Sequence, residues 1–192
     1  GRERFTTGLF LDGTLMPGLS YMAEFYYQGG TIDAGAADIT ISAMLAALRV
    51  GYTAPVWGKP RVEAFFDYLS GDDDPADDKS QSFDTLFATN HKFYGFMDAF
   101  LNIPAHTGGL GLMDMGGRAK LVPAKWFNVF LDFHHFATAQ DGPDIGQEID
   151  LIANFKVNRF ATIQAGFGVF LPAEERGDEV ATFGYLMANL AL

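Results

Sequence analysis

Cysteine is absent from the 192 residues, which excludes disulfide bridges and thiolate metal sites but leaves the cellular compartment open. Basic residues are also few, because 13 Lys and Arg stand against 24 Asp and Glu, for a net charge of −11 at pH 7. A protein that binds nucleic acid needs a basic face to meet the phosphates. We therefore expect no nucleic-acid partner.

Long apolar runs are missing as well. The longest, ISAMLAALRVGY, is interrupted by Arg49 and is too short for a membrane-spanning helix. The first ten residues, GRERFTTGLF, lack the apolar core and the cleavage site of a signal peptide. We therefore expect either a protein that is not secreted or a sequence whose N-terminal part is missing.

Glycine and aromatic residues are abundant, and the hydrophobic pattern has a period of two, as in β-strands. Between Lys125 and Thr138, for example, the apolar Phe127, Val129, Leu131 and Phe133 alternate with Asn128, Phe130, Asp132 and His134. The segment 39–53 alternates least, and we predict a strand there because its neighbours are strands. The pattern predicts about nine strands, over residues 3–13, 18–28, 39–53, 60–70, 109–122, 125–138, 145–156, 160–170 and 180–191.

The predicted strands are long, and the connections between them alternate between short and long. Most strands have ten or more residues, whereas a strand that crosses a bilayer needs about nine to eleven. Outer-membrane barrels have short turns on one side and long loops on the other. Alternation alone fits the half-buried strands of a soluble sheet equally well. The strand lengths and the alternation of short and long connections together favour an all-β, antiparallel transmembrane β-barrel.

The longest connection begins with the stretch SGDDDPADDKSQSFDTLFATNHKFYGFMD, Ser70 to Asp98. This stretch resembles the signature loop of the alginate-export family of outer-membrane β-barrels. Downstream, GQEIDLIANFKVNRFATIQAGFGVFLPAE resembles the penultimate hairpin of the same family. The resemblance covers about residues 40–192, and it implies a bacterial outer-membrane channel of roughly eighteen strands that exports an anionic polysaccharide such as alginate. The residues before 40 fit only as generic barrel strands.

We call residues 71–108 the insert and predict that it is a long extracellular loop. Its tip carries five aspartates within seven residues, and Pro75 blocks both helix and strand there. Carboxylate oxygens suit calcium, which leaves a calcium site at Asp72, Asp74 and Asp77 as an alternative to a solvated loop tip. The second half is too apolar to stay in water, so we expect its apolar residues to pack over the barrel mouth or at the headgroup level: Phe83, Leu86, Phe87, Phe93, Tyr94, Phe96 and Met97.

The sequence offers no catalytic constellation, and we predict that the protein is not an enzyme. His134 and His135 are adjacent on a strand, so their side chains point to opposite faces and do not chelate one metal together. A barrel phospholipase would need a serine–histidine couple, and neither Ser42 nor Ser70 has a histidine in register. The glycine-rich stretch GLGLMDMGG lacks the lysine and the strand-to-helix context of a phosphate-binding loop.

The polar faces of the strands would form the lumen of the barrel. By alternation, five cations and seven acids, Glu24 among them, would face it together with amides and His134. We expect these residues to line the pore: Arg49, Arg61, Glu63, Asp67, Asp114, Arg118, Lys120, Asn128, Asp132, His134, Glu148, Asp150, Asn154 and Lys156. The resemblance implies that Arg61, Arg118, Lys120 and Lys156 form the filter for a polyuronate. The alternative is that opposite charges in the lumen pair across strands only to neutralise one another.

Nine is an odd number of strands, whereas single-chain bacterial barrels have even numbers. Residues 1–192 would then be one domain that forms the C-terminal half of a larger barrel; several copies forming one barrel, or a small closed barrel, are the alternatives. We expect a channel for passive passage of an anionic polysaccharide or another polar solute, in contact with the lipid bilayer and lipopolysaccharide. A structural or adhesive barrel whose loops bind partners, and a soluble β-sandwich that binds carbohydrate, remain the other hypotheses.

Overall fold

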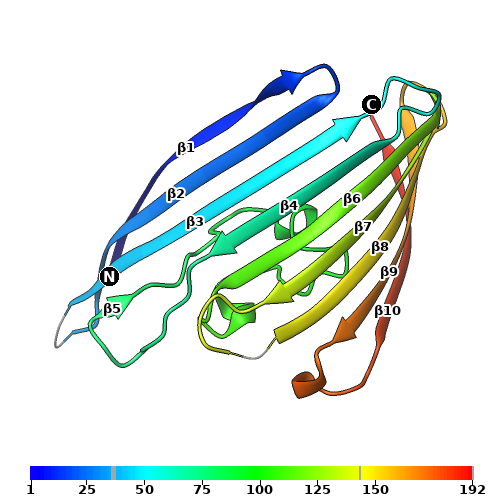
Figure 1. Ribbon diagram of the computed structural model, residues 1–192. Coiled ribbons are helices and arrows are strands. Elements are labelled where there is room, and N and C mark those ends of the chain that lie inside the picture. The colour runs from blue at the N-terminus through cyan, green and yellow to red at the C-terminus, as the bar shows by residue number, and fades with distance from the viewer. Residues whose placement is uncertain (36–37, 143, 192) are drawn as a thin grey trace.

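The computed structural model describes residues 1–35, 38–142 and 144–191. Nine long strands follow one another in a single sheet, and each is antiparallel to its neighbours (Figure 1). Their bounds are β1 Arg2–Met16, β2 Leu19–Asp33, β3 Asp38–Thr53, β4 Arg61–Leu69, β6 Leu112–Ala124, β7 Phe127–Ala137, β8 Asp144–Lys156, β9 Ala161–Pro172 and β10 Ala181–Leu190.

The remaining elements are short. Strand β5 (Lys79–Ser80) lies in the insert and pairs in parallel with Thr40 and Ile41 of β3. Three single 3₁₀ turns occur in the long connections: η1 (Asn90–Lys92), η2 (Ala105–Thr107) and η3 (Glu174–Arg176). In the parts of the chain that the structure describes, no helix has the length and apolar character needed to cross a membrane.

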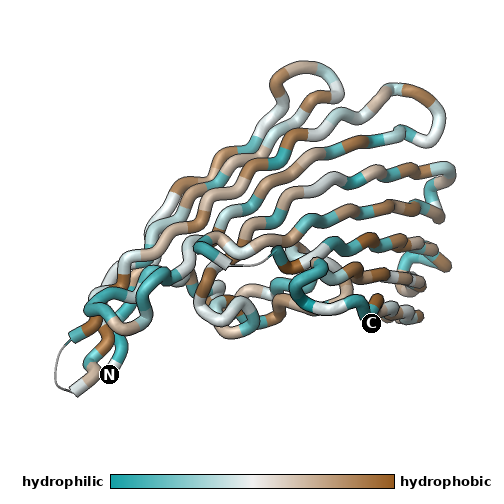
Figure 2. Tube along the Cα trace, turned by 60° about the horizontal axis from the view of Figure 1, so that its bottom comes forward, coloured by the Kyte–Doolittle hydropathy of each residue, from teal (hydrophilic) through white to brown (hydrophobic). Residues whose placement is uncertain are grey.

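The nine predicted strands are confirmed, including the weakly alternating segment 39–53, which forms β3. The predicted alternation is confirmed too, and Figure 2 shows hydrophilic and hydrophobic residues taking turns along the strands. In β8, Glu148, Asp150 and Ile152 are buried, whereas the intervening Ile149 and Leu151 are exposed. The short β5 and the 3₁₀ turns were not predicted, because segments of two or three residues carry no periodic signal.

The sheet is curved and open. Strands β1 and β10 are its two ends, and each pairs with one neighbour only, β2 and β9 respectively. We call the concave side, in which the insert lies, the inner face, and the convex side the outer face (Figure 1). The all-β antiparallel class predicted from the sequence is therefore confirmed, in an open sheet.

The hydrophobic core lies between the inner face and the insert. Phe83, Tyr94, Phe100 and Ile103 of the insert meet side chains of β3, β4, β6, β7 and β8. These sheet residues are Ala43, Leu69, Leu112, Phe136 and Ile145. The insert therefore occupies the hollow of the curved sheet near the ends of the strands from which it emerges.

The prediction that the second half of the insert packs is right for most residues and wrong for two. Phe83 and Tyr94 are buried, and Phe93, Phe96 and Met97 are half-buried. Leu86 and Phe87 are instead exposed, Phe87 completely. They sit in a tight turn, where the Leu86 amide donates to Asp84 and the Ala88 amide donates to the carbonyl of Thr85, and this turn directs them away from the core.

Candidate channel-lining site

Polar and charged side chains form continuous rows across the inner face. The register pairs Glu63 of β4 with Arg118 of β6, Arg118 with Asp132 of β7, and Asp132 with Asp150 of β8. Because cross-strand partners share a face and alternate residues repeat it, the register brings all the predicted pore-lining residues to the inner face. They are Arg49, Arg61, Glu63, Asp67, Asp114, Arg118, Lys120, Asn128, Asp132, His134, Glu148, Asp150, Asn154 and Lys156.

Two of the arginines meet a carboxylate on a neighbouring strand. The guanidinium of Arg118 donates two bonds to the carboxylate of Asp132, one of them from Nε to Oδ1 at 2.5 Å. Arg49 Nη2 donates to Asp67 Oδ2 at 2.8 Å. A bidentate arginine–carboxylate pair fixes the side chains as well as neutralising them.

Other charges differ in their pairing. Arg61 pairs with Glu63 on its own strand, and Nδ1 of His134 lies 2.8 Å from a carboxylate oxygen of Asp114. Lys120 and Lys156 form no ion pair with any residue that the structure describes. The inner face therefore combines neutralised pairs with two lysines that have no ion-pair partner among the described residues.

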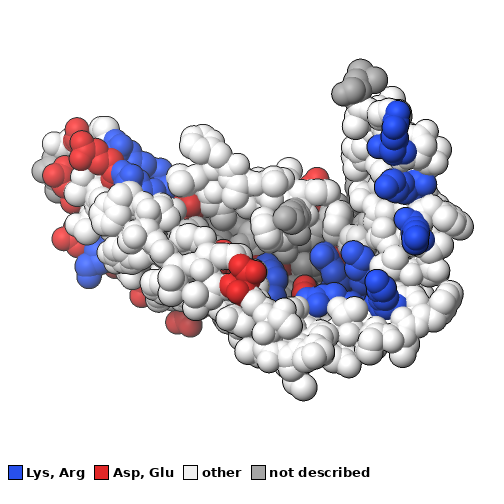
Figure 3. All heavy atoms as spheres, turned by 90° about the horizontal axis from the view of Figure 1, so that it is seen from above, with Lys and Arg blue, Asp and Glu red and all other residues white. Residues whose placement is uncertain are grey.

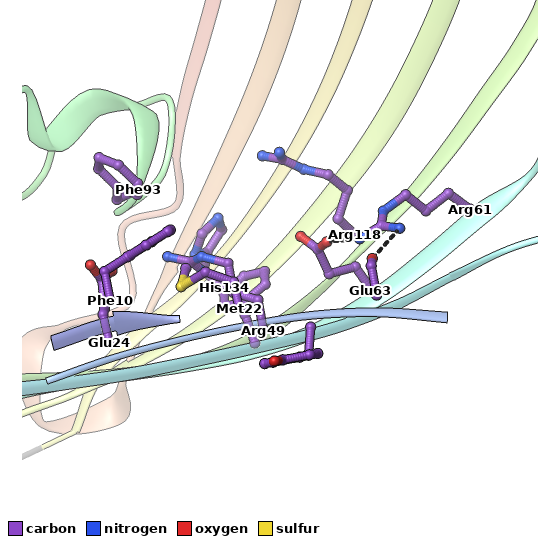
Figure 4. Close-up of a pocket in the computed structure, with 12 residues that line it drawn as sticks. Phe10, Met22, Glu24, Arg49, Arg61, Glu63, Phe93, Arg118 and His134 are labelled. Carbon is purple, nitrogen blue, oxygen red and sulfur yellow. Dashed lines mark hydrogen bonds and ion pairs between the residues drawn. The ribbon is translucent and has the colours of Figure 1, made fainter. Parts of the chain in front are cut away.

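A cavity of about 430 Å³ opens on the inner face where three arginines converge, Arg49, Arg61 and Arg118. Figure 4 shows Arg61, Arg118 and Glu63 projecting into it from the sheet, with Phe93 of the insert on another side. Aromatic rings support the arginines. The guanidinium carbon of Arg49 lies 5.4 Å from the centre of the Phe65 ring, and that of Arg118 lies 4.7 Å from Phe130. Stacking on a ring leaves the guanidinium edge free for carboxylate oxygens.

A ladder of uncharged polar groups continues the inner face toward β10. Asn154 donates to Asn128 Oδ1 at 3.2 Å, and Gln164 donates to Asn154 Oδ1 at 2.7 Å. The hydroxyl of Tyr185 completes the ladder by donating to Gln164 Oε1 at 2.8 Å. These hydrogen bonds cross four strands, so the polar rows extend over the sheet from β3 to β10.

Two carboxylates of β8 hold the insert against the sheet. The amide of Met97 donates to Glu148 Oε1 at 2.9 Å, and the amide of Phe96 donates to Asp150 Oδ2 at 3.3 Å. A side chain at Gly95 would meet Glu148 Oε1 at 2.3 Å, and the φ of +82° also favours glycine there. The other oxygens, Glu148 Oε2 and Asp150 Oδ1, are buried and have no hydrogen-bond partner among the described residues.

A second attachment joins the insert to β1 and β2. Arg4 donates to the Asp84 carboxylate, while Gln28 and Asp84 exchange two hydrogen bonds, Gln28 Nε2 to the Asp84 carbonyl at 2.8 Å and the Asp84 amide to Gln28 Oε1 at 3.0 Å. Partial burial alone would raise the pKa of Asp84. The hydrogen bonds from Arg4 and from the Leu86 amide, with the charges of Arg4 and Arg2, outweigh the burial and hold this pKa below its ordinary value.

The acidic tip forms local turns. Asp72 accepts a hydrogen bond from the amide of Asp74, Asp74 from the amide of Ala76, and Asp77 from the amide of Lys79. Within the described part of the chain, no group of three or more His, Asp or Glu side chains is arranged to hold a metal ion. The calcium alternative at these aspartates stays a prediction.

Some residues that build the site were not singled out from the sequence. Gln28 shares the face of Glu24 by alternation, so an extended count along β2 would have found it. Phe130 was placed on the polar face by alternation, but nothing in the sequence predicted that it supports an arginine. Phe65 was not assigned to a face, because a large aromatic residue on the polar face looks like a membrane-facing one. Asp84 lies in a connection without periodicity, and its pairing with β1, 80 residues away, leaves no local signal.

Comparison with known proteins gives one family. A family model described as "Alginate export" matches residues 1–137, from the start of the chain to the end of β7. The match includes the first strands, for which the sequence predicted only generic barrel strands, and it stops before the hairpin formed by β8 and β9. No curated protein matches the chain.

Proposed function

Because the chain belongs to the alginate-export family, we propose that its sheet forms part of the wall of an outer-membrane channel. The solute is an anionic polysaccharide such as alginate, or another polar molecule, and it passes down its own gradient. The family is one of export proteins and not of enzymes.

One observation carries the proposal: outside the hydrophobic core under the insert, the two faces of the sheet differ in chemistry. The outer face exposes large apolar side chains, among them Leu131, Leu151 and Phe167. The inner face presents the rows of paired charges, the amide ladder and the arginine-lined cavity. An apolar exterior with a polar interior is what a strand needs when lipid lies on one side and water on the other.

The number of strands limits how this open sheet could be completed to a barrel. With nine long strands, β1 and β10 run in the same direction, toward the end where the short turns lie (Figure 1). Direct closure of this sheet on itself would therefore join two parallel strands. Two copies with the same orientation in the membrane, related by a two-fold axis along the barrel, would join parallel strands at both seams. Only an odd number of additional strands gives antiparallel seams throughout, and nine more would make the eighteen that the family resemblance implies.

Lipid makes such closure necessary. An open edge in hydrocarbon leaves backbone N–H and C=O groups without partners, at a cost of several kcal/mol each. We propose that further strands of the same polypeptide, rather than a second copy, complete the barrel. Mass and stoichiometry of the inserted protein test this point directly.

The experiment for conduction uses ion selectivity in planar bilayers. Arg61, Arg118, Lys120 and Lys156 are each replaced by Gln, with Asp132→Asn added so that no buried carboxylate is left without Arg118. We expect the reversal potential in a salt gradient to move toward that of the cation, because most of the remaining inner charge is acidic. The matched control is Lys79→Gln, a cation in the insert near the exposed tip. An unchanged reversal potential would show that these cations serve only to neutralise their neighbours.

A second function, a structural or adhesive barrel whose loops bind partners, is favoured by one observation. The insert fills part of the hollow with a hydrophobic core, as a permanent plug would. Conductance separates the two functions. Stable open steps support the channel, whereas folded, inserted protein that never conducts supports the structural barrel.

A further inference from the structure

The short turns at one end of the sheet share an unusual composition. They comprise residues 17–18, 54–60, 125–126 and 157–160, and they contain no acidic residue. Three of them carry one cation within two residues of a large aromatic side chain: Lys59 with Trp57, Lys125 with Trp126 and Arg159 with Phe160. The opposite connections are acidic, with seven Asp in residues 70–111 and four Asp or Glu in residues 173–180. We call the six named side chains the aromatic–basic rim.

All six side chains of the rim are exposed. Trp57 is 77%, Trp126 59% and Phe160 52% accessible. The three cations are exposed as well and form no ion pair or side-chain hydrogen bond with any described residue. The guanidinium of Arg159 lies 4.4 Å from the centre of the Phe160 ring.

The rim is continuous, because neighbouring turns are hydrogen-bonded to adjacent strands. The amide of Val122 in β6 donates to the carbonyl of Gly58, and the amide of Lys156 in β8 donates to the carbonyl of Trp126. Figure 3 shows basic side chains gathering on the side of the molecule where the short turns lie, with few acidic ones among them. Beneath the turn 54–60, a shallow groove of about 310 Å³ runs over the outer face, lined largely by Leu19, Val50, Tyr52, Val62 and Ala64.

We propose that the aromatic–basic rim binds the headgroups of anionic phospholipids, such as phosphatidylglycerol, in the leaflet at the short-turn end. The lipid phosphates lie against Lys59, Lys125 and Arg159. The tryptophans and Phe160 occupy the headgroup level, where aromatic side chains accumulate, and an acyl chain lies in the groove under the turn 54–60. This inference rests on the proposed function, because it needs the sheet to cross a bilayer.

Two features identify this ligand. Unpaired cations without any acid among them favour an anionic headgroup over a zwitterionic one. A soluble polyanion would also attract the cations, but it gives no reason for three exposed aromatic residues beside them. Aromatic and basic groups together match a surface that is apolar on one side and negatively charged on the other.

The chain carries its own probe for the test. Trp57 and Trp126 are the only two tryptophans of the 192 residues, and both belong to the rim. The protein is reconstituted in phosphatidylcholine vesicles that contain a minor fraction of either brominated phosphatidylglycerol or brominated phosphatidylcholine, and tryptophan quenching is compared. We expect phosphatidylglycerol to bind at least about fivefold more tightly, which is the contribution of about one basic residue at an anionic surface.

The triple variant Lys59→Gln, Lys125→Gln, Arg159→Gln should bring the two lipids to equal quenching, and added salt should weaken the preference in the unmodified protein. The matched control is the double variant Lys79→Gln, Arg176→Gln, at the opposite end of the sheet. It should keep the preference for phosphatidylglycerol. Equal quenching by both lipids in the unmodified protein, or a preference that survives the triple change, would overturn the proposal.

Two further outcomes identify what failed. If the triple change leaves the lipid preference intact but abolishes the effect of a soluble polyuronate on conductance, the cations serve the solute and not the lipid. If neither lipid quenches while aqueous iodide quenches both tryptophans, the sheet does not enter the bilayer. The proposed function then fails together with this inference.

Discussion

The two halves of the inner face have the same strand pattern but opposite environments. In the half next to the insert, Asp67, Asp114, Asp132, Glu148 and Asp150 are all buried. In the half toward the short turns, Arg61, Glu63 and Lys120 are half-exposed and Lys156 is exposed. Alternation decides which face a side chain joins, but the insert decides whether that side chain meets water or protein.

This difference explains the distribution of charge. A carboxylate under the insert must accept hydrogen bonds or meet a cation, because an unpaired buried charge is costly. Asp132 does so with Arg118, and Glu148 and Asp150 do so with the backbone of the insert. Toward the short turns the cations are in contact with water, and Lys120 and Lys156 form no ion pair with a described residue. The covered half holds the insert, and the open half contains the cations that the proposed channel would present to its solute.

Removing the core of the covered half should have the largest effect. Phe100 is 3% exposed, and its ring lies 4.7 Å from that of Phe136. We expect Phe100→Ala to cost about 3–5 kcal/mol of the free energy that docks the insert, as for large-to-small changes in a core. Limited proteolysis should then cut the insert at sites that resist cleavage in the unmodified protein.

The matched control is Phe87→Ala, a phenylalanine of the same insert that is fully exposed. It should leave the proteolytic pattern unchanged. Equal sensitivity of the two variants to protease would mean that the hydrophobic core does not hold the insert in place. The docked insert would then not explain why one half of the inner face is buried and the other is not.

The outer face provides the next test. Leu131 is 46% exposed on the outer face, and its neighbour Asp132 is completely buried on the inner face. Leu131→Arg should cost about 2–4 kcal/mol if the residue lies near the middle of the bilayer. Asn128→Arg, on the inner face of the same strand, should cost much less. Denaturant unfolding in vesicles measures both, and equal costs would contradict the assignment of the faces to lipid and water.

The order and facing of the strands could be predicted from the sequence, because a period of two is a local signal repeated over ten or more residues. The same signal placed Asp132 and Glu148 on the inner face before any contact was known. The position of the insert could not be predicted, since it depends on contacts such as Arg4 with Asp84 and Phe96 with Asp150, which are far apart in sequence. Nor does composition distinguish Phe87, which is exposed, from Phe83, which is buried.

Acid should weaken the attachment at Asp84, with a smaller effect. Since the pKa of Asp84 in the folded protein lies below its ordinary value, the carboxylate stabilises the docked insert fully above the unfolded pKa, about 4. That stabilisation is lost as the pH falls through the lower, folded pKa. The protection factors of the insert amides against hydrogen exchange, which are corrected for the intrinsic pH dependence of exchange, should therefore be constant between about pH 5 and 8 as far as Asp84 is concerned. They should fall at more acidic pH.

Asp84→Asn separates this group from the other acids. We expect this change to cost about 1 kcal/mol near neutral pH, as for a partly exposed ion pair with a charged hydrogen bond. The loss of protection of the insert at acidic pH should be smaller in the variant than in the unmodified protein. An acid response identical in the variant and the unmodified protein would assign the effect to the carboxylates under the insert instead.

The smallest effect is expected at the tip, where neither half of the inner face is involved. A deletion from Asp72 to Ser80 would remove β5 and the bond from the Thr40 amide to the Asp78 carbonyl, so the cut is restricted to Asp73–Ala76. These four residues are exposed, and replacing them by a Gly-Ser link should change stability by less than about 0.5 kcal/mol.

Calcium and chelator should have equally little effect on the unmodified protein, because Asp72, Asp74 and Asp77 already accept backbone hydrogen bonds. Thermal unfolding with and without calcium measures this. If the midpoint rose with calcium concentration in the unmodified protein but not in the shortened one, the tip would be a metal site, as mass action then requires.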